Sequence, residues 1–291
     1  MRGFAVASDK LIARKSREYA TQKLEWLDFY LHAALSATTK KLDRVYVDLF
    51  AGPGRNVSAT GEFEGSPIRA LRARGPGVRA PSFTEAVFVN AALAQHDALS
   101  RRVAEVCKRG EGAVPQEKVR LIRGDANSAV PEIMASLPSQ AYVFVFADIE
   151  RPGHFPWDSV QALKAQGHKS VDFYVLFPLE MGIRRLLPYS PGRVLGGEAK
   201  LTAFFGTDEW KPILAARKTG SQSTDFHRRM TDLYCRQLRT LWDGARPVLQ
   251  VSLAGHHWLY RMLFASSHDA AERISAAIAR KMKTRSQLEF L

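Results

Sequence analysis

The sequence has 291 residues with only two cysteines, and its 42 Lys and Arg outnumber 29 Asp and Glu to give a formal net charge of +13. This length suits one large α/β domain, or a core domain with a sizeable insertion. The cysteines, Cys107 and Cys235, lie far apart and in no CxxC pair. Their placement argues against a disulfide framework and against a cysteine-built zinc site.

The positive charge favours polyanionic partners, which include nucleic acid, nucleotides and phosphorylated metabolites. No block of five or more like charges concentrates the excess, so an even spread over the surface explains it equally well. The first residues contain no apolar core of signal-peptide length, and no later apolar run is long enough to span a membrane. We therefore expect a cytoplasmic protein that does not associate with membranes.

The first predicted element is a helix over residues 21–35, because Leu24, Leu27, Leu31 and Leu35 recur on one helical stripe. Short apolar runs typical of buried strands follow at residues 45–50, 85–90, 119–124, 142–148 and 171–177. Segments able to form helices separate them, at residues 66–74, 92–109 and 157–165. This alternation predicts a parallel sheet that is covered on both faces.

The regular spacing is lost after the fifth strand. Residues 182–223 mix prolines, glycines and bases, and we interpret them as an insertion over the sheet edge. Thr224 is the expected N-cap of an amphipathic helix. The runs at 248–253 and 258–264 then predict a closing hairpin, and a last helix follows.

Five βα units followed by an antiparallel pair predict an α/β fold with a seven-stranded Rossmann-like sheet and helices on both faces. That order of elements is the class I S-adenosylmethionine (SAM) methyltransferase arrangement, and the hairpin distinguishes it from an ordinary dinucleotide-binding fold. The predicted organisation is an N-terminal helical segment, a core in two pieces and an insertion after strand 5 that forms a lid: residues 1–44, then 45–181 with 224–291, and 182–223.

The segment VYVDLFAGPGRN at residues 45–56 places glycines where the first strand ends. Ligands bind at that edge of an open α/β sheet, and glycine permits positive φ and close backbone approach. The GxGxxG spacing of a pyrophosphate cradle is absent, whereas a carboxylate before the glycines suits the ammonium and sulfonium of SAM. The alternative is a tight turn without a ligand. The predicted cofactor-binding residues of this loop are Asp48, Phe50, Ala51, Gly52, Pro53 and Gly54.

Two further strand ends supply cofactor candidates. Asn90 ends the second strand, where its amide can bond a ribose hydroxyl without the strength of a carboxylate. Asp125 and Ala126 follow the third strand, where an acid can accept from the adenine amino group. The alternative reading makes Asp125 a helix cap, and one side chain does not easily do both.

The fourth strand ends at Asp148, beside the expected cofactor. Methyl transfer is an in-line displacement, so the enzyme positions a nucleophile and removes a proton where needed. Asp148 is the first candidate for that base or orienting group, with Glu150 and His154 behind it. The alternative is that Asp148 caps the helix at Trp157 or pairs with Arg151.

Two missing signatures narrow the chemistry. No Pro-Cys pair supplies the thiol for cytosine C5 methylation, and residues 148–151 read Asp-Ile-Glu-Arg where amino-directed enzymes carry Asp/Asn-Pro-Pro-aromatic. Base methylation is therefore supported by charge alone. His256 and His257 lack a third ligand at recognisable spacing, so no metal site is predicted.

Other polar residues are placed from their positions in the chain. Ser66 and Pro67 read as the N-cap and first position of a helix that begins just after the glycine loop. Three arginines of the expected lid are candidates for an anionic group of the acceptor: Arg184, Arg185 and Arg193.

Taken in order, these pieces resemble the three-Cys-motif partner protein family over nearly the whole chain. The resemblance includes TQKLEWLDFYLHAAL, YVDLFAGPGR with the trailing EGSP, FADIERPG with FPW, VDFYVLFP, FFGTDEW and WLYRMLFASSH. It implies a SAM-dependent methyltransferase-like fold and says little about substrate. Family members usually carry an acid at the position of Asn90 and Asp-Pro at Asp148–Ile149, and both departures lie in the active-site region.

The leading hypothesis is a SAM-dependent methyltransferase whose acceptor is polar and anionic, either a small metabolite or a nucleotide. The alternative is a non-catalytic SAM- or nucleotide-binding partner of a nucleic-acid modification or defence system. A nicotinamide-dependent enzyme is disfavoured because GxGxxG is missing.

Overall fold

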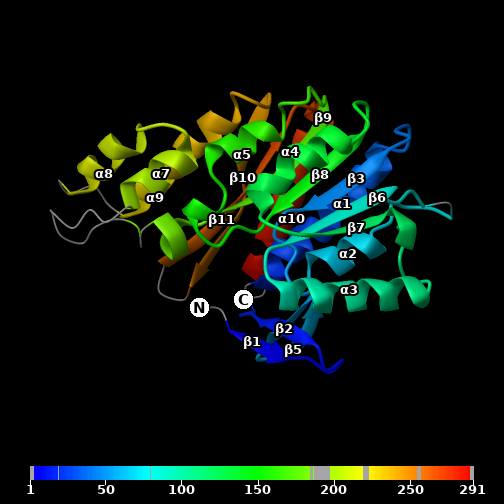
Figure 1. The fold of residues 1–291 in the computed structure, drawn as a ribbon. Helices are drawn as coiled ribbons and strands as arrows, with labels where there is room; N and C mark the ends of the chain where they lie inside the picture. Colours follow the sequence, from blue (N-terminus) through cyan, green and yellow to red (C-terminus); the bar gives the residue numbers. More distant parts are fainter. Residues whose placement is uncertain are drawn as a thin grey trace.

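A computed structural model describes most of the chain, namely residues 3–18, 20–78, 80–183, 186, 197–218, 223–253 and 257–288. Its centre is a seven-stranded sheet in the order β10-β11-β9-β8-β3-β6-β7 (Figure 1). The strands are β3 (Arg44–Asp48), β6 (Glu85–Asn90), β7 (Val119–Arg123), β8 (Tyr142–Ala147), β9 (Ser170–Phe177), β10 (Gly244–Leu253) and β11 (His257–Ser266).

The five strands of this sheet that come first in the chain are parallel, namely β3, β6, β7, β8 and β9. The strand β11 is antiparallel to both β9 and β10. Every residue of β8 and β9 is buried, as expected for apolar strands covered on both faces. The predicted seven-stranded methyltransferase-like sheet with its closing hairpin is therefore confirmed. β3 is an interior strand of the sheet, and its neighbours β6 and β8 lie on opposite sides of it.

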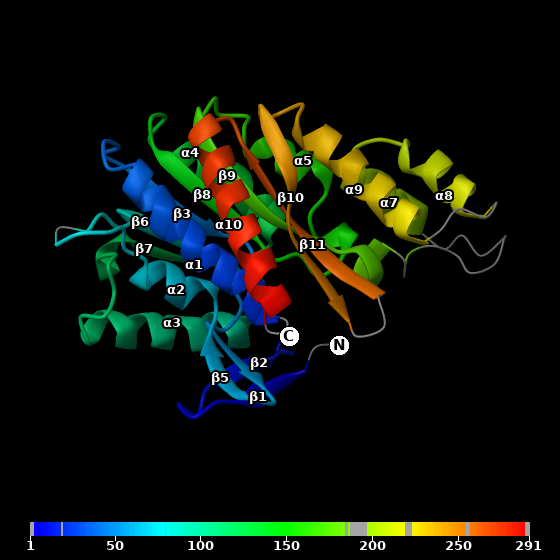
Figure 2. The same cartoon turned by 180° about the vertical axis from the view of Figure 1, so that it is seen from behind.

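Helices cover both faces of the sheet. In Figure 2, α1 and α10 lie across one face, whereas α4 and α5 lie on the other face in Figure 1. The aromatic side chains of α1 pack into the core, where Trp26 stacks on Tyr174 of β9 with ring centroids 4.1 Å apart. The helices are α1 (Ala20–Ala37), α2 (Ser66–Arg72), α3 (Leu93–Lys108), α4 (Ala126–Ser136), α5 (Trp157–Ala162), α7 (Gly197–Phe205), α8 (Trp210–Lys218), α9 (Ser223–Leu238) and α10 (Asp269–Leu288), with short helical turns η1 (Gln116–Lys118), η2 (Pro152–His154) and η3 (Leu179–Ile183).

A second, four-stranded sheet was not predicted. Its order is β1-β2-β4-β5, formed by β1 (Phe4–Val6), β2 (Ile12–Lys15), β4 (Arg55–Ser58) and β5 (Gly61–Glu64). The strand β2 lies parallel to β4, so the N-terminal segment returns beside the chain that leaves the glycine loop. Figure 2 shows this small sheet projecting near α2 and α3. Residues 1–44 thus contain two strands as well as the predicted helix.

Two helices, α7 and α8, lie within the segment predicted to be an insertion. Phe204 of α7 packs flat against Tyr234 of α9, with ring centroids 4.7 Å apart, and Trp210 of α8 is fully buried. The described parts of residues 182–223 therefore share a core with α9, while the division of the chain into domains stays a prediction. No helix among the described residues is long and apolar enough to cross a membrane.

One arginine joins the N-terminal strands to the core. Arg102 of α3 is 5% exposed, and its guanidinium donates to both carboxylate oxygens of Asp9 at 2.8 and 2.9 Å. The same group donates to the carbonyls of Ile12 at 2.8 Å and Pro53 at 2.5 Å. Arg102 also holds the pKa of Asp9 below its usual value. A single buried side chain therefore connects α3, the N-terminal segment and the glycine loop.

Replacing Arg102 by methionine should lower the free energy of unfolding by about 2–4 kcal/mol, because several carbonyl and carboxylate acceptors lose their donor. Urea unfolding measures the loss, and trypsin should cleave more rapidly within residues 10–15. The exposed neighbour Arg101→Met is the matched control and should change stability by about 0.5 kcal/mol or less. Equal effects of the two substitutions would contradict the assigned role of Arg102.

Candidate active site

The glycine loop follows β3 and turns sharply. Gly52 and Gly54 have φ angles of 63° and 80°, which L residues adopt at a cost. A Cβ at Gly54 would lie 2.9 Å from Leu99, so that position also lacks space for a side chain. A Cβ at Gly52 would meet no atom closer than 4.0 Å. A side chain at Gly52 would therefore only touch the ends of Arg14 and Gln95, so the loop backbone stays accessible there to a ligand.

Asp48 shapes this loop from within the protein. It is fully buried, and its carboxylate accepts from the Ser66 hydroxyl at 2.6 Å, the Phe50 N–H at 3.2 Å and the Tyr46 hydroxyl at 3.4 Å. Ser66 is thus not the N-cap of α2, as predicted, since that position is Gly65 and Ser66 is the first helical residue. Burial raises the pKa of Asp48 to about 7. The hydrogen bonds from Ser66 and Phe50 lower this pKa, but they offset only part of the effect of burial.

A cavity of about 320 Å³ lies at the carboxyl ends of the parallel strands, within the size range of small-molecule sites. Phe4 of β1 and Arg14 of β2 contribute to its wall, so the small sheet borders it. The predicted residues that line this cavity are Phe50, Gly52, Asn90, Asp125, Ala126, Asp148, Glu150 and His154. Asp48 does not line it, so the geometry does not support the predicted direct contact between this carboxylate and the cofactor.

Asn90 is 5% exposed and braces the loop. Its side-chain N–H donates to the carbonyl of Gly52 at 2.9 Å, which joins the end of β6 to the turn after β3. A carboxylate at this position could not make that bond, because an ionised acid has no donor. Asn90 stands where the resembled family usually carries an acid, and its amide N–H holds the glycine loop in a way that an acid could not.

Asp125 is the N-cap of α4. Both of its capping bonds, from the N–H groups of Asn127 at 2.9 Å and Ser128 at 3.4 Å, end on Oδ1. The second oxygen makes no hydrogen bond within the described part of the chain. Capping of α4 therefore uses one carboxylate oxygen of Asp125 and leaves the other for a ligand, so the two predicted roles are compatible.

Asp148 takes part in a buried ion-pair cluster that was not predicted. Its Oδ2 accepts from Arg14 of β2 at 3.1 Å and from the ammonium of Lys23 on α1. Asp148 does not cap α5, whose N-cap is Pro156. The signal for Lys23 lies in its spacing, because it stands four residues before Leu27 on the apolar stripe of α1. Arg14 offers no comparable signal.

A second, smaller cavity of about 30 Å³ adjoins this cluster. The predicted residues Ala51, Pro53 and Gly54 line it. Four residues line both this cavity and the 320 Å³ cavity: Arg14, Phe50, Gly52 and Asp148. The glycine loop and the ion-pair cluster therefore form the boundary between the two spaces. Every predicted loop residue except Asp48 borders one space or the other.

Glu150 and His154 lie on the segment after β8. A carboxylate oxygen of Glu150 lies 3.5 Å from Arg14, so this arginine contacts both acids of the segment. Partial burial lowers the pKa of His154, which leaves the imidazole neutral at pH 7 and able to accept a proton.

Arg184, Arg185, Arg193 and His256 lie outside the described residues, as does the side chain of His257. Within the described part of the chain, no three His, Cys, Asp or Glu side chains are grouped so that they could hold a metal ion.

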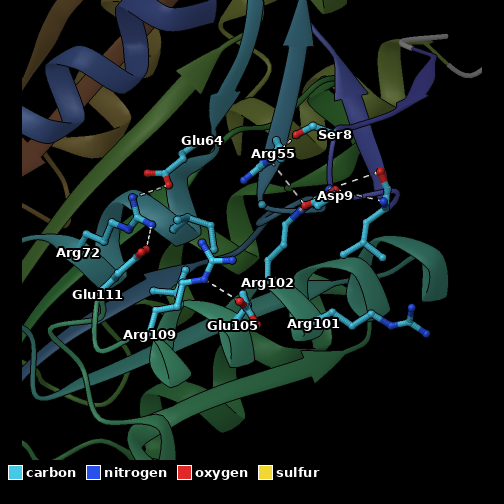
Figure 3. Close-up of a pocket in the computed structure, with 14 residues that line it drawn as sticks. Ser8, Asp9, Arg55, Glu64, Arg72, Arg101, Arg102, Glu105, Arg109 and Glu111 are labelled. Atoms are coloured by element: carbon cyan, nitrogen blue, oxygen red, sulfur yellow. Dashed lines mark hydrogen bonds and ion pairs between the residues drawn. The ribbon is translucent and has the colours of Figure 1, made fainter.

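The largest of the three cavities, about 570 Å³, lies between the small sheet, α2 and α3 (Figure 3). Its charges are paired, as when Arg72 contacts both Glu64 and Glu111. Arg109 pairs with Glu105 at 2.6 Å, and Arg101 extends away from these pairs. Because carboxylates already engage most of these arginines, size alone does not make this cavity the reaction site.

Comparisons with known proteins find likeness only in three dimensions. No family model matches the chain, and no curated protein sequence matches it. Protein LPL1258 from Legionella pneumophila, of the DUF519 family model, has a TM-score of 0.47 and 10% identity over 86% of this chain and 89% of its own. The putative methyltransferase yhhF from Escherichia coli has a TM-score of 0.37 and 14% identity over 82% and 86%.

An rRNA methylase from Streptococcus thermophilus has a TM-score of 0.40 and 6% identity, over 84% of this chain and 95% of its own. Methyltransferases thus recur among the solved structures that this chain is similar to. At these identities and TM-scores, the likeness assigns neither an activity nor a substrate.

The raised pKa of Asp48 makes stability depend on pH. Between the unfolded value of 3.8 and about 7, the folded state retains a proton that the unfolded state has lost. The contribution of Asp48 to the free energy of unfolding is therefore fully present below pH 3.8, falls as pH rises towards 7, and is lost above about pH 7. Asp48→Asn removes this titration, so from pH 5 to pH 8 the variant should gain about 2–3 kcal/mol in free energy of unfolding relative to the wild type.

Urea unfolding of both proteins at the two pH values measures this difference, and titration of all other groups cancels in the comparison. A stability difference that stays constant with pH would show that Asp48 titrates at its ordinary value.

Proposed function

We propose that this chain is a SAM-dependent methyltransferase of the three-Cys-motif partner family that acts on a polar, anionic acceptor. The observation that carries the proposal is the 320 Å³ cavity at the carboxyl ends of β3, β6 and β8. It lies where the strand order reverses, beside a loop whose glycines have positive φ. The cavity that Gly52 lines and the second oxygen of Asp125 suit a nucleoside.

The residues of the cavity have distinct roles in this proposal. The backbone of residues 50–54 forms the floor beneath the nucleoside. Asn90 offers its amide oxygen to a ribose hydroxyl while its N–H holds Gly52. Asp125 offers Oδ2 to the adenine amino group, and Ala126 leaves room beside it. When bound, SAM supplies an electrophilic methyl group.

The acceptor then needs orientation and, where its nucleophile carries a proton, a base. His154 suits that base, because its lowered pKa leaves the imidazole neutral at pH 7 and the residue lines the cavity. Asp148 is less suited, since its Oδ2 would have to release a cation before it could take a proton. We assign Asp148 to orienting the site, with Glu150 beside it.

The acceptor is a small metabolite or a nucleotide, and only the net charge of +13 favours nucleic acid. Arg184, Arg185 and Arg193 stay candidates for its anionic group. The second candidate function is a SAM- or nucleotide-binding partner protein without turnover, and the ion pairs on Asp148 favour it. Cofactor binding without methyl transfer to any acceptor screened would select this second function.

Substitution at Gly52 tests the cofactor site. Gly52→Ala adds a methyl group to the cavity floor at a position with space in the ligand-free protein, so it should fold and bind the cofactor at least about tenfold more weakly. The backbone strain is about 1–2 kcal/mol. Calorimetric titration with S-adenosylhomocysteine measures the affinity.

Gly110→Ala is the matched control, because Gly110 has a φ of 67° and no atom within 4 Å of its added Cβ, and it lies outside the cavity. It should cost similar stability and leave the affinity unchanged. If the wild type binds neither SAM nor S-adenosylhomocysteine, the proposed function is refuted.

A further inference from the structure

Two basic side chains converge on one carboxylate oxygen beside the glycine loop. Lys23 is 4% exposed and the Arg14 side chain 16%, and both contact Oδ2 of Asp148. Burying an ammonium costs several kcal/mol unless anions surround it. Two cations that share one oxygen also repel each other, and a further anion beside them, in addition to Glu150 at 3.5 Å from Arg14, would relieve that repulsion.

The protein holds Lys23 firmly in this place. Its backbone carbonyl accepts from the Tyr174 hydroxyl at 3.3 Å, and its ammonium lies 6.0 Å from the centre of the Tyr260 ring. Those tyrosines belong to β9 and β11, so α1 and two strands together fix one lysine. Binding groups need such support to keep their geometry.

The cluster of Arg14, Lys23 and Asp148 also lies at the boundary between the two cavities beside the glycine loop. Lys23 lines only the smaller cavity, whereas Arg14 and Asp148 line both. A ligand whose nucleoside occupies the larger cavity would direct its tail across Gly52 towards these cations. The smaller cavity, about 30 Å³, has room for a small polar group and not for a second large ligand.

From this geometry we infer that Lys23 and Arg14 form the subsite for the carboxylate of the cofactor's amino-acid tail. The inference rests on the proposed function and adds binding residues to it that lie outside the glycine loop. Arg14 brings a fork of five N–H donors, of which contacts to Asp148 and Glu150 use two nitrogens. The N-terminal segment thereby becomes part of the cofactor site.

The experiment compares two ligands that differ in the tail. S-adenosylhomocysteine has the amino-acid tail, and 5′-methylthioadenosine lacks it. Calorimetry should show that the wild type prefers S-adenosylhomocysteine, and Lys23→Met should weaken that ligand about ten- to hundredfold. Binding of 5′-methylthioadenosine should change by less than about threefold, because its adenosine contacts lie in the other cavity.

Lys15→Met is the matched control, because this exposed lysine lies beside Arg14 on β2 and lines neither of the two cavities. It should leave both affinities unchanged. Lys23→Met combined with Asp148→Asn keeps the cluster's net charge and guards against a folding defect, which the melting temperature reports. The double variant should show the same selective loss.

The inference is overturned if Lys23→Met keeps the wild-type preference, which would leave these cations to an anion of the acceptor. Equal weakening of both ligands overturns it as well, since Lys23 would then support the whole cavity. Binding of neither ligand by the wild type refutes the proposed function and this inference with it. Binding of both ligands with no preference in the wild type refutes the inference alone.

Discussion

The candidate site depends on the hydrogen bonds that the buried carboxylate of Asp48 accepts. This carboxylate accepts hydrogen bonds from the backbone just after it and from the first residue of α2, so one side chain fixes both ends of the segment that contains the glycine loop and the hairpin β4–β5. Such a carboxylate is costly to bury, and its pKa of about 7 records that cost. The loop gains a fixed shape, and a fixed shape is what close approach by a nucleoside requires.

The N-terminal segment completes the site from the other side. Arg102 joins this segment to α3, and β2 then places the Arg14 side chain beside Gly52 of the loop. The helix α1 follows at once and places Lys23 against Asp148, in the cavity that the loop also lines. Residues from before the first strand of the main sheet therefore meet residues from the ends of β3, β6 and β8, and the cavity has a wall that the methyltransferase-like sheet alone would not provide.

Sequence reasoning predicted the main sheet well for a physical reason. Strands buried on both faces are runs of apolar residues, such as YVFVFA in β8, and these stand out from their surroundings. The strands of the small sheet have only three or four residues and are partly exposed, as in IARK of β2, so no period or run marks them. Local pattern could not show that they pair.

The candidate site was predictable only in part for the same reason. Position at a strand end located Asn90, Asp125 and Asp148, because parallel strands bring their carboxyl ends to one edge. Partners that come from distant segments leave no signal in the local pattern, so the sequence predicts Asp148 as a base or orienting group without showing its contacts with Arg14 and Lys23. The role of a carboxylate depends on such neighbours more than on its position in a motif.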